Sequence, residues 1–472
     1  MHMKAPRRQD PDQMRSPIDG FPRPSRADRP PRPQRLAGKA ACAAVIGALG
    51  LCLTTPLCAE ERKVMRASDL IEMIGVNVHM GYTDGAYVRA DNVLADLKFL
   101  GINHIRDVLR GIESQPALQA RAALKGLVHN NIRLNIFCPT GWDATSVAWL
   151  RSLETAVPGA IASIEGYNEI NNFPVTFEGQ SGAAAAKAGQ KALYETIKSD
   201  EVLKHVPVID MTGFEMIRDP TFSYATTLTG YADVMNIHAY AQNGAQPHDW
   251  INPARPAIYK NVGADLPKVI TEFGYASRPE SNWGFIGVDE RTQAKGVLNG
   301  LFAAARSGYD KVYLYELLDE KPDPALTDLQ FHFGLFTFDN TPKLAAQTIR
   351  NVTTILASDD QPPKSPGTPA NEPPISVRAD EPDNDLPVYS MVLAKGNGTR
   401  IVAVWREPPF WDRATGRPLE APSIQATVSF GRSCGTIKIY DVLRSGEPTS
   451  TGRGNSLALA VLDHVQLLEC AP

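Results

Sequence analysis

The segment Ser163–Phe173 reads SIEGYNEINNF. A short run with strand propensity ends in Tyr167, Asn168 and Glu169 and then breaks at once into asparagine-rich residues of the kind that form loops. A carboxylate therefore stands where a buried strand reaches the surface. Taken alone, the pattern fits an ordinary strand end as well as one half of a catalytic carboxylate pair, so the rest of the chain has to decide between them.

Seven similar runs accompany this one. Each is a near-continuous apolar stretch, as expected for a strand that is buried on both faces, and each is followed by a helix-like segment or a crossover. Eight such units within about 290 residues predict a (β/α)8 barrel, a TIM barrel of the α/β class, although a doubly wound open sheet shows the same alternation. The fifth crossover, residues 214–231, has the weakest helical pattern. The eight runs are GVNVHM, HIRDVL, RLNIFCP, SIEGYNEI, PVIDMTG, DVMNIHAY, KVITEFGY and KVYLYELLD.

The pattern changes after the barrel, which we assign to residues 60–358. Residues 359–375 are rich in proline and predict a linker or a wrapping loop. Residues 376–472 contain short runs of alternating apolar and polar residues, which predict a small antiparallel β-sandwich. This domain could bind sugar or serve only to brace the barrel, and its short length favours bracing.

The first 59 residues have a different composition. A basic, proline-rich stretch of the kind that stays disordered precedes Lys39, the apolar run Ala40–Leu53 and a small residue at Ala59. These are the parts of a secretory signal, so we expect export to the periplasm or outside the cell. An uncleaved membrane anchor is the alternative. No later stretch approaches the roughly 20 apolar residues of a membrane span.

Charge and cysteine content narrow the class of protein. The 472 residues carry a formal net charge of -4, which gives no electrostatic footprint for nucleic acid. Of six cysteines, three leave with the signal; Cys434 and Cys470 either form a disulfide or, with Cys138, are buried thiols. No cysteine and histidine cluster has metal-ligand spacing, so we expect no metal or organic cofactor. We also expect a monomer.

Polar residues recur at corresponding ends of the strands. Glu272 lies on the seventh run at the same depth as Glu169 on the fourth, and ionisable groups are costly in apolar strands unless they are paired. In a barrel, strands four and seven face each other across the mouth, where active sites lie. His79 ends the first run, and His238 and Tyr240 end the sixth; Arg106 follows the start of the second run, and Tyr315 and Glu316 lie on the eighth.

Two such glutamates suit the hydrolysis of a glycosidic bond with retention, which needs carboxyl groups about 5–5.5 Å apart. One attacks as the nucleophile, while the other protonates the leaving oxygen and later deprotonates water. The acid must keep its proton near neutral pH, and we expect the neighbouring carboxylate to raise its pKa. Arg106 and Tyr240 would keep the nucleophile ionised, although Arg106 could instead pair with Asp107 or Glu316.

The motifs around these residues resemble those of a known enzyme family. Tyr-Asn-Glu on the fourth run, Thr-Glu-Phe-Gly on the seventh and His-Ala-Tyr on the sixth resemble the clan A glycoside hydrolases, which are retaining enzymes on (β/α)8 barrels. The resemblance covers Met65 to Ser358 and points to a poorly described bacterial branch with a C-terminal β-sandwich. It implies a β-linked saccharide as substrate. It further implies Glu169 as acid/base, Glu272 as nucleophile, Asn168 at the sugar 2-hydroxyl, Tyr240 and Arg106 beside the nucleophile, and His238 at the subsite of cleavage.

The eighth run departs from this family, whose members often place a tryptophan there. Tyr315 would substitute as the sugar platform and Glu316 would face a polar group of the sugar. Trp142 and Trp283 lie in loops of the active face and are candidate sugar contacts, whereas Trp250 could be either a contact or a packing residue. His104, at the start of its strand, is expected to be structural. Two functional alternatives stay open, a transglycosidase on the same site and a catalytically silent carbohydrate-binding or scaffold protein.

Overall fold

The computed structural model describes ten ranges of the chain, and everything below concerns these residues. The signal region, most of the fifth crossover and of the linker, and the residues Cys138 and Trp283 lie outside them. The span from Lys63 to Pro472 forms one compact unit. The described ranges are 64–109, 114–137, 142–173, 175–213, 230–252, 266–278, 287–326, 328–358, 374–381 and 386–472.

All eight predicted barrel strands form, and they pair in parallel in the order β8-β5-β4-β3-β2-β11-β10-β9. The two ends of this sheet meet at a bridge between Ile209 and Val234, where the Asp210 amide donates to the Val234 carbonyl at 3.0 Å. This contact nearly closes the sheet, so the fold is the predicted barrel and not an open sheet. The strands are β2 (Ile74–Asn77), β3 (His104–Val108), β4 (Arg133–Phe137), β5 (Ile161–Glu165), β8 (Val208–Ile209), β9 (Met235–His238), β10 (Lys268–Phe273) and β11 (Lys311–Leu314).

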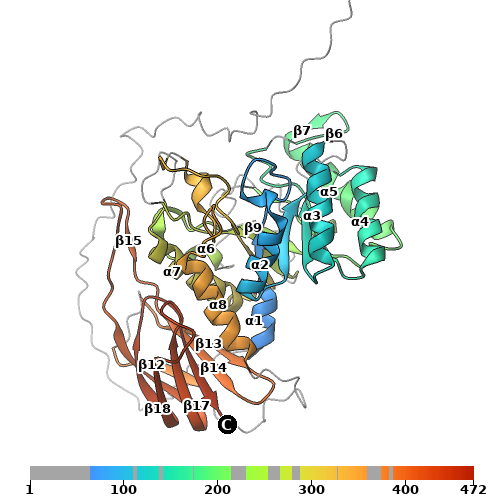
Figure 1. Ribbon diagram of the computed structural model, residues 1–472. Helices are drawn as coiled ribbons and strands as arrows, with labels where there is room; N and C mark the ends of the chain where they lie inside the picture. The colour runs from blue at the N-terminus through green and yellow to red at the C-terminus, as the bar shows by residue number, and fades with distance from the viewer. Residues whose placement is uncertain are drawn as a thin grey trace, which may run out of the picture. The chain divides into compact units, whose positions relative to one another are not determined.

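The helices surround this barrel (Figure 1). Ser114, Asp143 and Asp289 cap three of them by accepting a hydrogen bond from a backbone amide three residues further on, which satisfies a donor of the first turn. The six longer helices bury apolar residues, as the spacing predicted, whereas α1 and α6 were not predicted. The helices are α1 (Ala67–Met73), α2 (Ala90–Leu100), α3 (Gln115–Val128), α4 (Ala144–Ala156), α5 (Gly182–Ser199), α6 (His248–Ile251), α7 (Glu290–Arg306) and α8 (Leu344–Ala357).

The C-terminal residues form the predicted β-sandwich, with two differences in detail. The short runs IQATVSF and GTIKIYDVL, which on their alternation would each form a strand, are parts of one bulged strand, β17. The sheet also takes in β1, which precedes the barrel in sequence and pairs in parallel with β13. Its strands are β1 (Met65–Arg66), β12 (Ser376–Ala379), β13 (Tyr389–Ala394), β14 (Arg400–Trp405), β17 (Ile424–Asp441), β18 (Ser450–Val461) and β19 (Gln466–Ala471); two small hairpins are β6–β7 (Thr176–Phe177, Gln180–Ser181) and β15–β16 (Trp411–Asp412, Arg417–Pro418).

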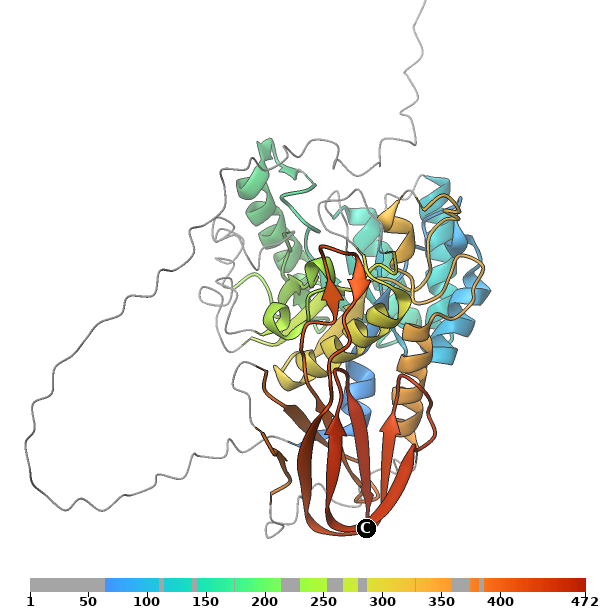
Figure 2. The same cartoon turned by 90° about the vertical axis from the view of Figure 1, so that its left-hand side faces the viewer.

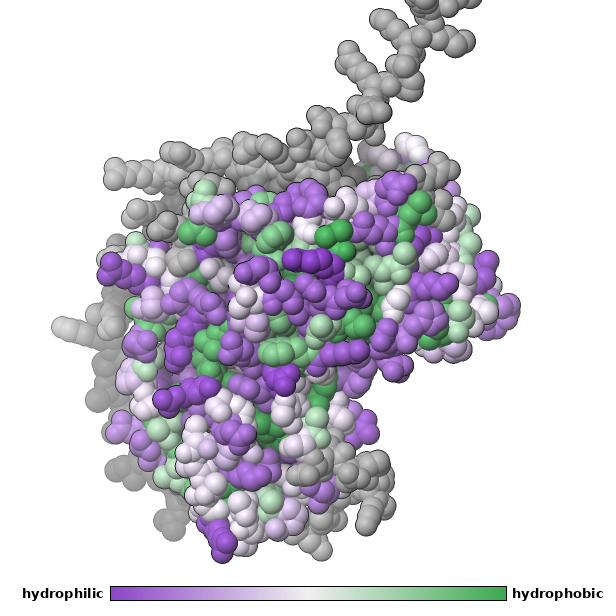
Figure 3. Space-filling model, in the orientation of Figure 1, coloured by the Kyte–Doolittle hydropathy of each residue, from purple (hydrophilic) through white to green (hydrophobic). Residues whose placement is uncertain are grey.

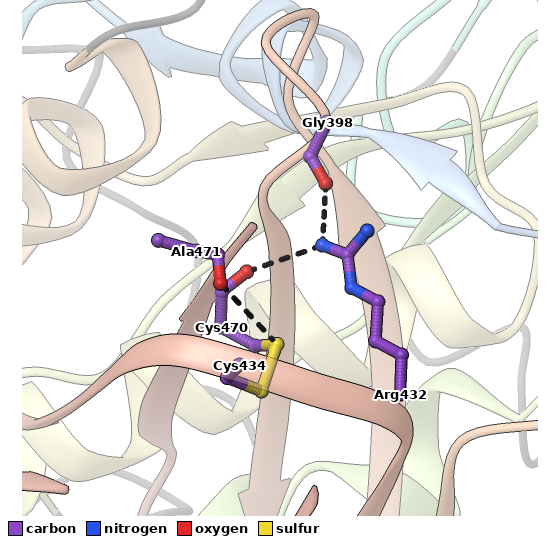
Figure 4. Close-up of a disulfide and its surroundings, with 5 residues drawn as sticks. All are labelled: Gly398, Arg432, Cys434, Cys470 and Ala471. Atoms are coloured by element: carbon purple, nitrogen blue, oxygen red, sulfur yellow. Dashed lines mark hydrogen bonds between the residues drawn. A yellow bond between two sulfur atoms is a disulfide. The ribbon is translucent and has the colours of Figure 1, made fainter. Parts of the chain in front are cut away.

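Cys434 and Cys470 form the disulfide that the sequence allowed, with their Cα atoms 5.3 Å apart. It links β17 to β19, and Arg432 donates to the carbonyls of Gly398 and Cys470 beside it (Figure 4). Both cysteines are buried in a separate apolar cluster within the sandwich. The bond therefore holds together a small core of its own.

The outer surface carries few large apolar side chains. Hydrophilic and hydrophobic residues are mixed over the face shown in Figure 3. Among the described residues, no helix has the length and apolar character needed to span a membrane.

A buried charge network joins the barrel to the sandwich, where α7 and α8 lie beside it (Figures 1 and 2). Lys295 on α7 contacts Asp463 at 2.6 Å, and His464 lies between Asp463 at 2.9 Å and Asp441 at 3.0 Å. Burial alone would lower the pKa of His464, but its hydrogen bonds to both aspartates raise it above the usual value. Two cations therefore balance two carboxylates at this interface.

We predict that His464→Gln removes a pH-dependent part of the stability. The stabilisation from a raised histidine pKa is complete below the unfolded value of about 6.5 and is lost as the pH rises through the folded value. Between pH 6.5 and 9, the free energy of unfolding of the wild type should fall by about 1–3 kcal/mol more than that of the variant. Denaturant unfolding at several pH values measures this. The exposed His129→Gln should match the wild type, and a His464→Gln curve parallel to it would contradict the prediction.

Candidate active site

A layer of polar side chains fills the barrel interior below the predicted site. Six strands each contribute one of these residues, and the charged members are Arg106 and Glu165. Inward-facing positions of a small barrel are usually apolar, so this layer has to satisfy its own hydrogen bonds. Its members are Asn77 (β2), Arg106 (β3), Asn135 (β4), Glu165 (β5), Asn236 (β9) and Thr271 (β10).

Arg106 is the centre of this layer and is 1% exposed. It binds Glu165 with two parallel hydrogen bonds of 2.8 Å, and it reaches Glu272 at 2.7 Å. Asn77 and Asn168 accept from it at 2.9 and 2.7 Å, so all five of its N–H donors have partners. Burial alone would lower the pKa of Arg106, but the charges of Glu165 and Glu272 raise it, and the guanidinium stays charged.

Of these partners, Glu272 is the one that the family resemblance implied, and the alternatives that the sequence left open are not used. Asp107 and Glu316 accept none of its hydrogen bonds, and Glu165 takes the place assigned to them. Glu165 is 0% exposed and also accepts from Asn135, Asn236 and Thr271. It lies in the run SIEGYNEI, where its charge inside an apolar strand was a signal for a buried cation partner. The sequence analysis considered only Glu169, at the end of this run, and did not single out Glu165.

Glu272 lies on β10 with both carboxylate oxygens held. Arg106 donates to Oε1 at 2.7 Å, and the Tyr240 hydroxyl donates to Oε2 at 2.8 Å. Burial and the charge of Glu272 raise the pKa of Tyr240 well above its ordinary value, so the phenol keeps the proton that it donates. The sequence placed these two residues beside Glu272, and the structure brings them there.

Glu169 lies in a turn after β5, with a left-handed backbone at φ 44°. Few residues other than glycine adopt this conformation, and such positions cluster at functional sites. Three hydrogen bonds hold the turn: the Glu169 amide donates to Thr212 Oγ1, and the amides of Asn172 and Phe173 donate to the Glu169 carbonyl. The turn directs the Glu169 carboxylate toward His238, whose Nδ1 lies 2.8 Å from Oε1.

The two glutamates meet as the barrel geometry predicted. One carboxylate oxygen of Glu169, one of Glu272 and a ring nitrogen of His238 all lie within 4.8 Å of one another. Glu169 and Glu272 are 9% and 8% exposed, whereas Glu165 beneath them is sealed at 0%. The upper pair therefore keeps some contact with solvent, which Glu165 lacks.

The pKa of the acid, Glu169, differs from the expectation that a neighbouring carboxylate would raise it. Although burial alone would raise it, the pKa of Glu169 is lowered, because His238 donates to it and carries opposite charge. Burial would lower the pKa of His238, but the carboxylates of Glu272 and Glu169 raise it. Instead of a raised carboxyl pKa, the structure thus shows a histidine and a carboxylate that hold one proton together.

Of the remaining residues that the sequence singled out, some lie beside this pair and others lie away from it. Asn168 is half-buried and gives its amide oxygen to Arg106, so its amide nitrogen is the end that can donate to a ligand. Trp142 is half-buried and donates to the Glu165 carbonyl at 3.3 Å. The Tyr315 ring packs edge-on to Tyr240 at 6.2 Å. Trp250 is buried in the core, and His104 contacts Glu72 at the start of β3, away from the strand ends.

His79 and Glu316 form a second cluster instead of joining the first. His79 Nε2 lies 3.2 Å from Glu316 Oε2, and Glu316 is 0% exposed. The His79 ring packs edge-on to Tyr315 at 5.6 Å, so this cluster lies one aromatic ring away from Tyr240. A third member, Glu320, was not found from the sequence.

We predict that Glu165→Gln strongly destabilises the fold, although the change is nearly isosteric. Removing one partner of a buried ion pair leaves a poorly compensated charge and typically costs about 3–5 kcal/mol. The matched control is Glu195→Gln, a carboxylate 60% exposed that pairs with Lys191 at 3.8 Å and should change stability by no more than about 0.5 kcal/mol. Chemical denaturation measures both. Equal effects of the two variants would contradict the role of Glu165.

No protein-family model and no curated protein matches the sequence. Solved structures do match the fold. The GH39 enzyme from Xanthomonas axonopodis pv. citri superposes with a TM-score of 0.52 at 13% identity, covering 87% of this chain and 96% of that one. A monomeric β-xylosidase from Caulobacter crescentus CB15 gives 0.49 at 12% identity, covering 85% and 96%. The exo-β-1,4-mannosidase Op5Man5 from Opitutaceae bacterium strain TAV5 gives 0.43 at 15% identity, covering 62% and 60%. The chain therefore has the fold that its resemblance to the clan A glycoside hydrolases implied, a (β/α)8 barrel followed by a β-sandwich.

Proposed function

We propose that this protein is a retaining glycoside hydrolase that cleaves a β-linked poly- or oligosaccharide. The observation that carries the proposal is that one carboxylate oxygen of Glu169 and one of Glu272 lie within 4.8 Å of each other. Retaining enzymes keep their two carboxyl groups about 5–5.5 Å apart, whereas inverting enzymes need about 6.5–9.5 Å to admit a water between them. This close approach of the two groups favours the retaining arrangement.

Glu272 is the nucleophile in this proposal. Its hydrogen bonds from Arg106 and Tyr240 stabilise the ionised carboxylate and fix its direction. One oxygen attacks the anomeric carbon, the bond to the leaving oxygen breaks, and a glycosyl ester forms. Tyr240 keeps its own proton and so acts as a donor throughout.

Glu169 supplies the proton that the leaving oxygen needs. In the free protein this proton is held between His238 Nδ1 and Glu169 Oε1, which are 2.8 Å apart. Transfer along this hydrogen bond makes Glu169 the acid, and His238 becomes neutral. In the second step Glu169 takes a proton from a water molecule, and the water oxygen attacks the anomeric carbon. The ester bond to Glu272 breaks, the Glu272 carboxylate is regenerated, and the configuration of the sugar is retained overall.

The glycone would be bound by the half-buried groups around the pair. The amide nitrogen of Asn168 is placed to donate to the 2-hydroxyl, and Tyr315 and Trp142 offer aromatic surface for the ring. The named activities of the structural neighbours, β-xylosidase and exo-β-1,4-mannosidase, support a carbohydrate substrate without naming the sugar. The Cys434–Cys470 disulfide supports the proposed export, since such bonds persist in oxidising compartments.

We predict that Glu272→Ala abolishes the release of reducing ends from whichever substrate the wild type cleaves. A panel of β-glucans, xylans, mannans, galactans and bacterial exopolysaccharides identifies that substrate. Azide should enter the cavity of Glu272→Ala and give a glycosyl azide of inverted configuration, while Glu169→Ala with azide should give the retained one. Nuclear magnetic resonance of the products distinguishes the two anomers.

The control variant for this experiment is Glu195→Gln, which should cleave the substrate at the wild-type rate. Glu169→Ala should slow substrates with poor leaving groups by about 10²–10⁴-fold and spare activated aryl glycosides at the first step. Unchanged cleavage by both alanine variants would refute the paired-glutamate site.

A further inference from the structure

The second cluster brings together one imidazole and two carboxyl groups. His79 follows β2, and Glu316 and Glu320 follow β11; one ring nitrogen and one oxygen from each carboxylate lie within 4.8 Å of one another. Glu316 is 0% and Glu320 5% exposed. The ligands come from two distant segments, so no spacing in the sequence could have shown them.

The catalytic cluster has the same composition, one histidine and two glutamates, but a different charge balance. There Arg106 makes an ion pair with Glu272 at 2.7 Å. Among the described residues, no lysine or arginine makes an ion pair with Glu316 or Glu320: the nearby Lys343 pairs with Asp319 at 2.7 Å and Lys321 with Asp84 at 2.8 Å. Two carboxyl groups are therefore buried without a positive partner other than an imidazole.

The polar atoms of this cluster are also incompletely bonded. Glu316 Oε2 accepts from the Tyr87 hydroxyl at 2.8 Å, whereas Glu316 Oε1 and His79 Nε2 are buried without a hydrogen bond. Glu320 Oε1 accepts from Gln330 at 2.9 Å.

We propose that His79, Glu316 and Glu320 bind one divalent transition-metal ion. Two carboxylates and a neutral imidazole would exactly offset its two positive charges, and imidazole with carboxylate ligands suits Zn²⁺ and Mn²⁺. Ligand atoms about 2.1 Å from a tetrahedral ion are roughly 3.4 Å apart. The distance of 3.2 Å between His79 Nε2 and Glu316 Oε2 is close to such an edge.

The surroundings resemble the outer shell of a metal site. Tyr87 and Gln330 each bond one oxygen of a carboxylate and orient the other, and the Leu318 amide donates to the Tyr87 hydroxyl at 3.0 Å. Gln330 also donates to the Tyr315 hydroxyl at 2.6 Å. The ion would thereby stiffen the wall formed by His79 and Tyr315. This inference concerns binding alone and does not depend on the glycosidase proposal.

The test is calorimetric titration of the full, chelator-stripped chain with ZnCl₂ and, separately, MnCl₂. We expect one ion per chain, with Mg²⁺ and Ca²⁺ binding far more weakly because they disfavour nitrogen ligands. Glu316→Gln and Glu320→Gln should weaken binding by at least about 100-fold, and Tyr87→Phe, which removes only an outer hydrogen bond, by about 10–100-fold. Circular dichroism shows whether each variant is folded.

The control is Glu169→Gln, which alters the other cluster and should leave metal affinity unchanged. No binding at millimolar Zn²⁺ and Mn²⁺ would overturn the proposal, as would binding that Glu169→Gln abolishes and Glu316→Gln spares. X-ray absorption of the Zn²⁺-loaded wild type gives a readout that needs no variant. It should show a single imidazole among oxygen neighbours; two or more imidazoles, or sulfur, would contradict this ligand set.

Discussion

The burial of one guanidinium group sets the constraint on which the rest of the site depends. A charge with 1% exposure is tolerable only if every donor finds a partner, and Arg106 meets this condition with carboxylates and amides from β2, β5, β10 and the turn after β5. The same bonds that offset its desolvation fix Glu272 and Asn168 in space. The hydrogen bonds that stabilise the barrel interior are therefore the same ones that position Glu272 and Asn168.

This constraint also divides the carboxylates into three kinds. Glu165 is sealed and neutralised by Arg106, and so belongs to the support of the site. Glu272 shares the same cation but is 8% exposed, which suits the nucleophile role that we propose for it. Glu316 and Glu320 make no ion pair with a lysine or arginine among the described residues, which is why we propose that they bind a cation from outside. The ion pair with Arg106 and the degree of burial thus distinguish the supporting Glu165, the proposed reaction centre and the proposed metal site.

Much of the architecture could be predicted from the sequence because burial on both faces leaves a direct mark. The eight strands, the sandwich and the meeting of Glu169 with Glu272 follow from apolar periodicity and from the rule that catalytic groups lie at strand ends. The pairing of Arg106 with Glu165 did not follow, because it depends on which residues face inward across the barrel. The position of the proton was also out of reach, since it depends on a distance of 2.8 Å between His238 and Glu169.

The most direct test of the central claim, that Glu272 attacks the sugar, is to trap the intermediate. A 2-deoxy-2-fluoro glycoside of the cleaved sugar with a good leaving group slows both steps and lets the glycosyl-enzyme accumulate. Mass spectrometry of the intact protein, followed by peptide mapping, locates the added sugar. We predict one sugar per chain, on the peptide that contains Glu272. A sugar on a peptide without Glu272, such as one containing Glu169 or Glu316, would contradict the account.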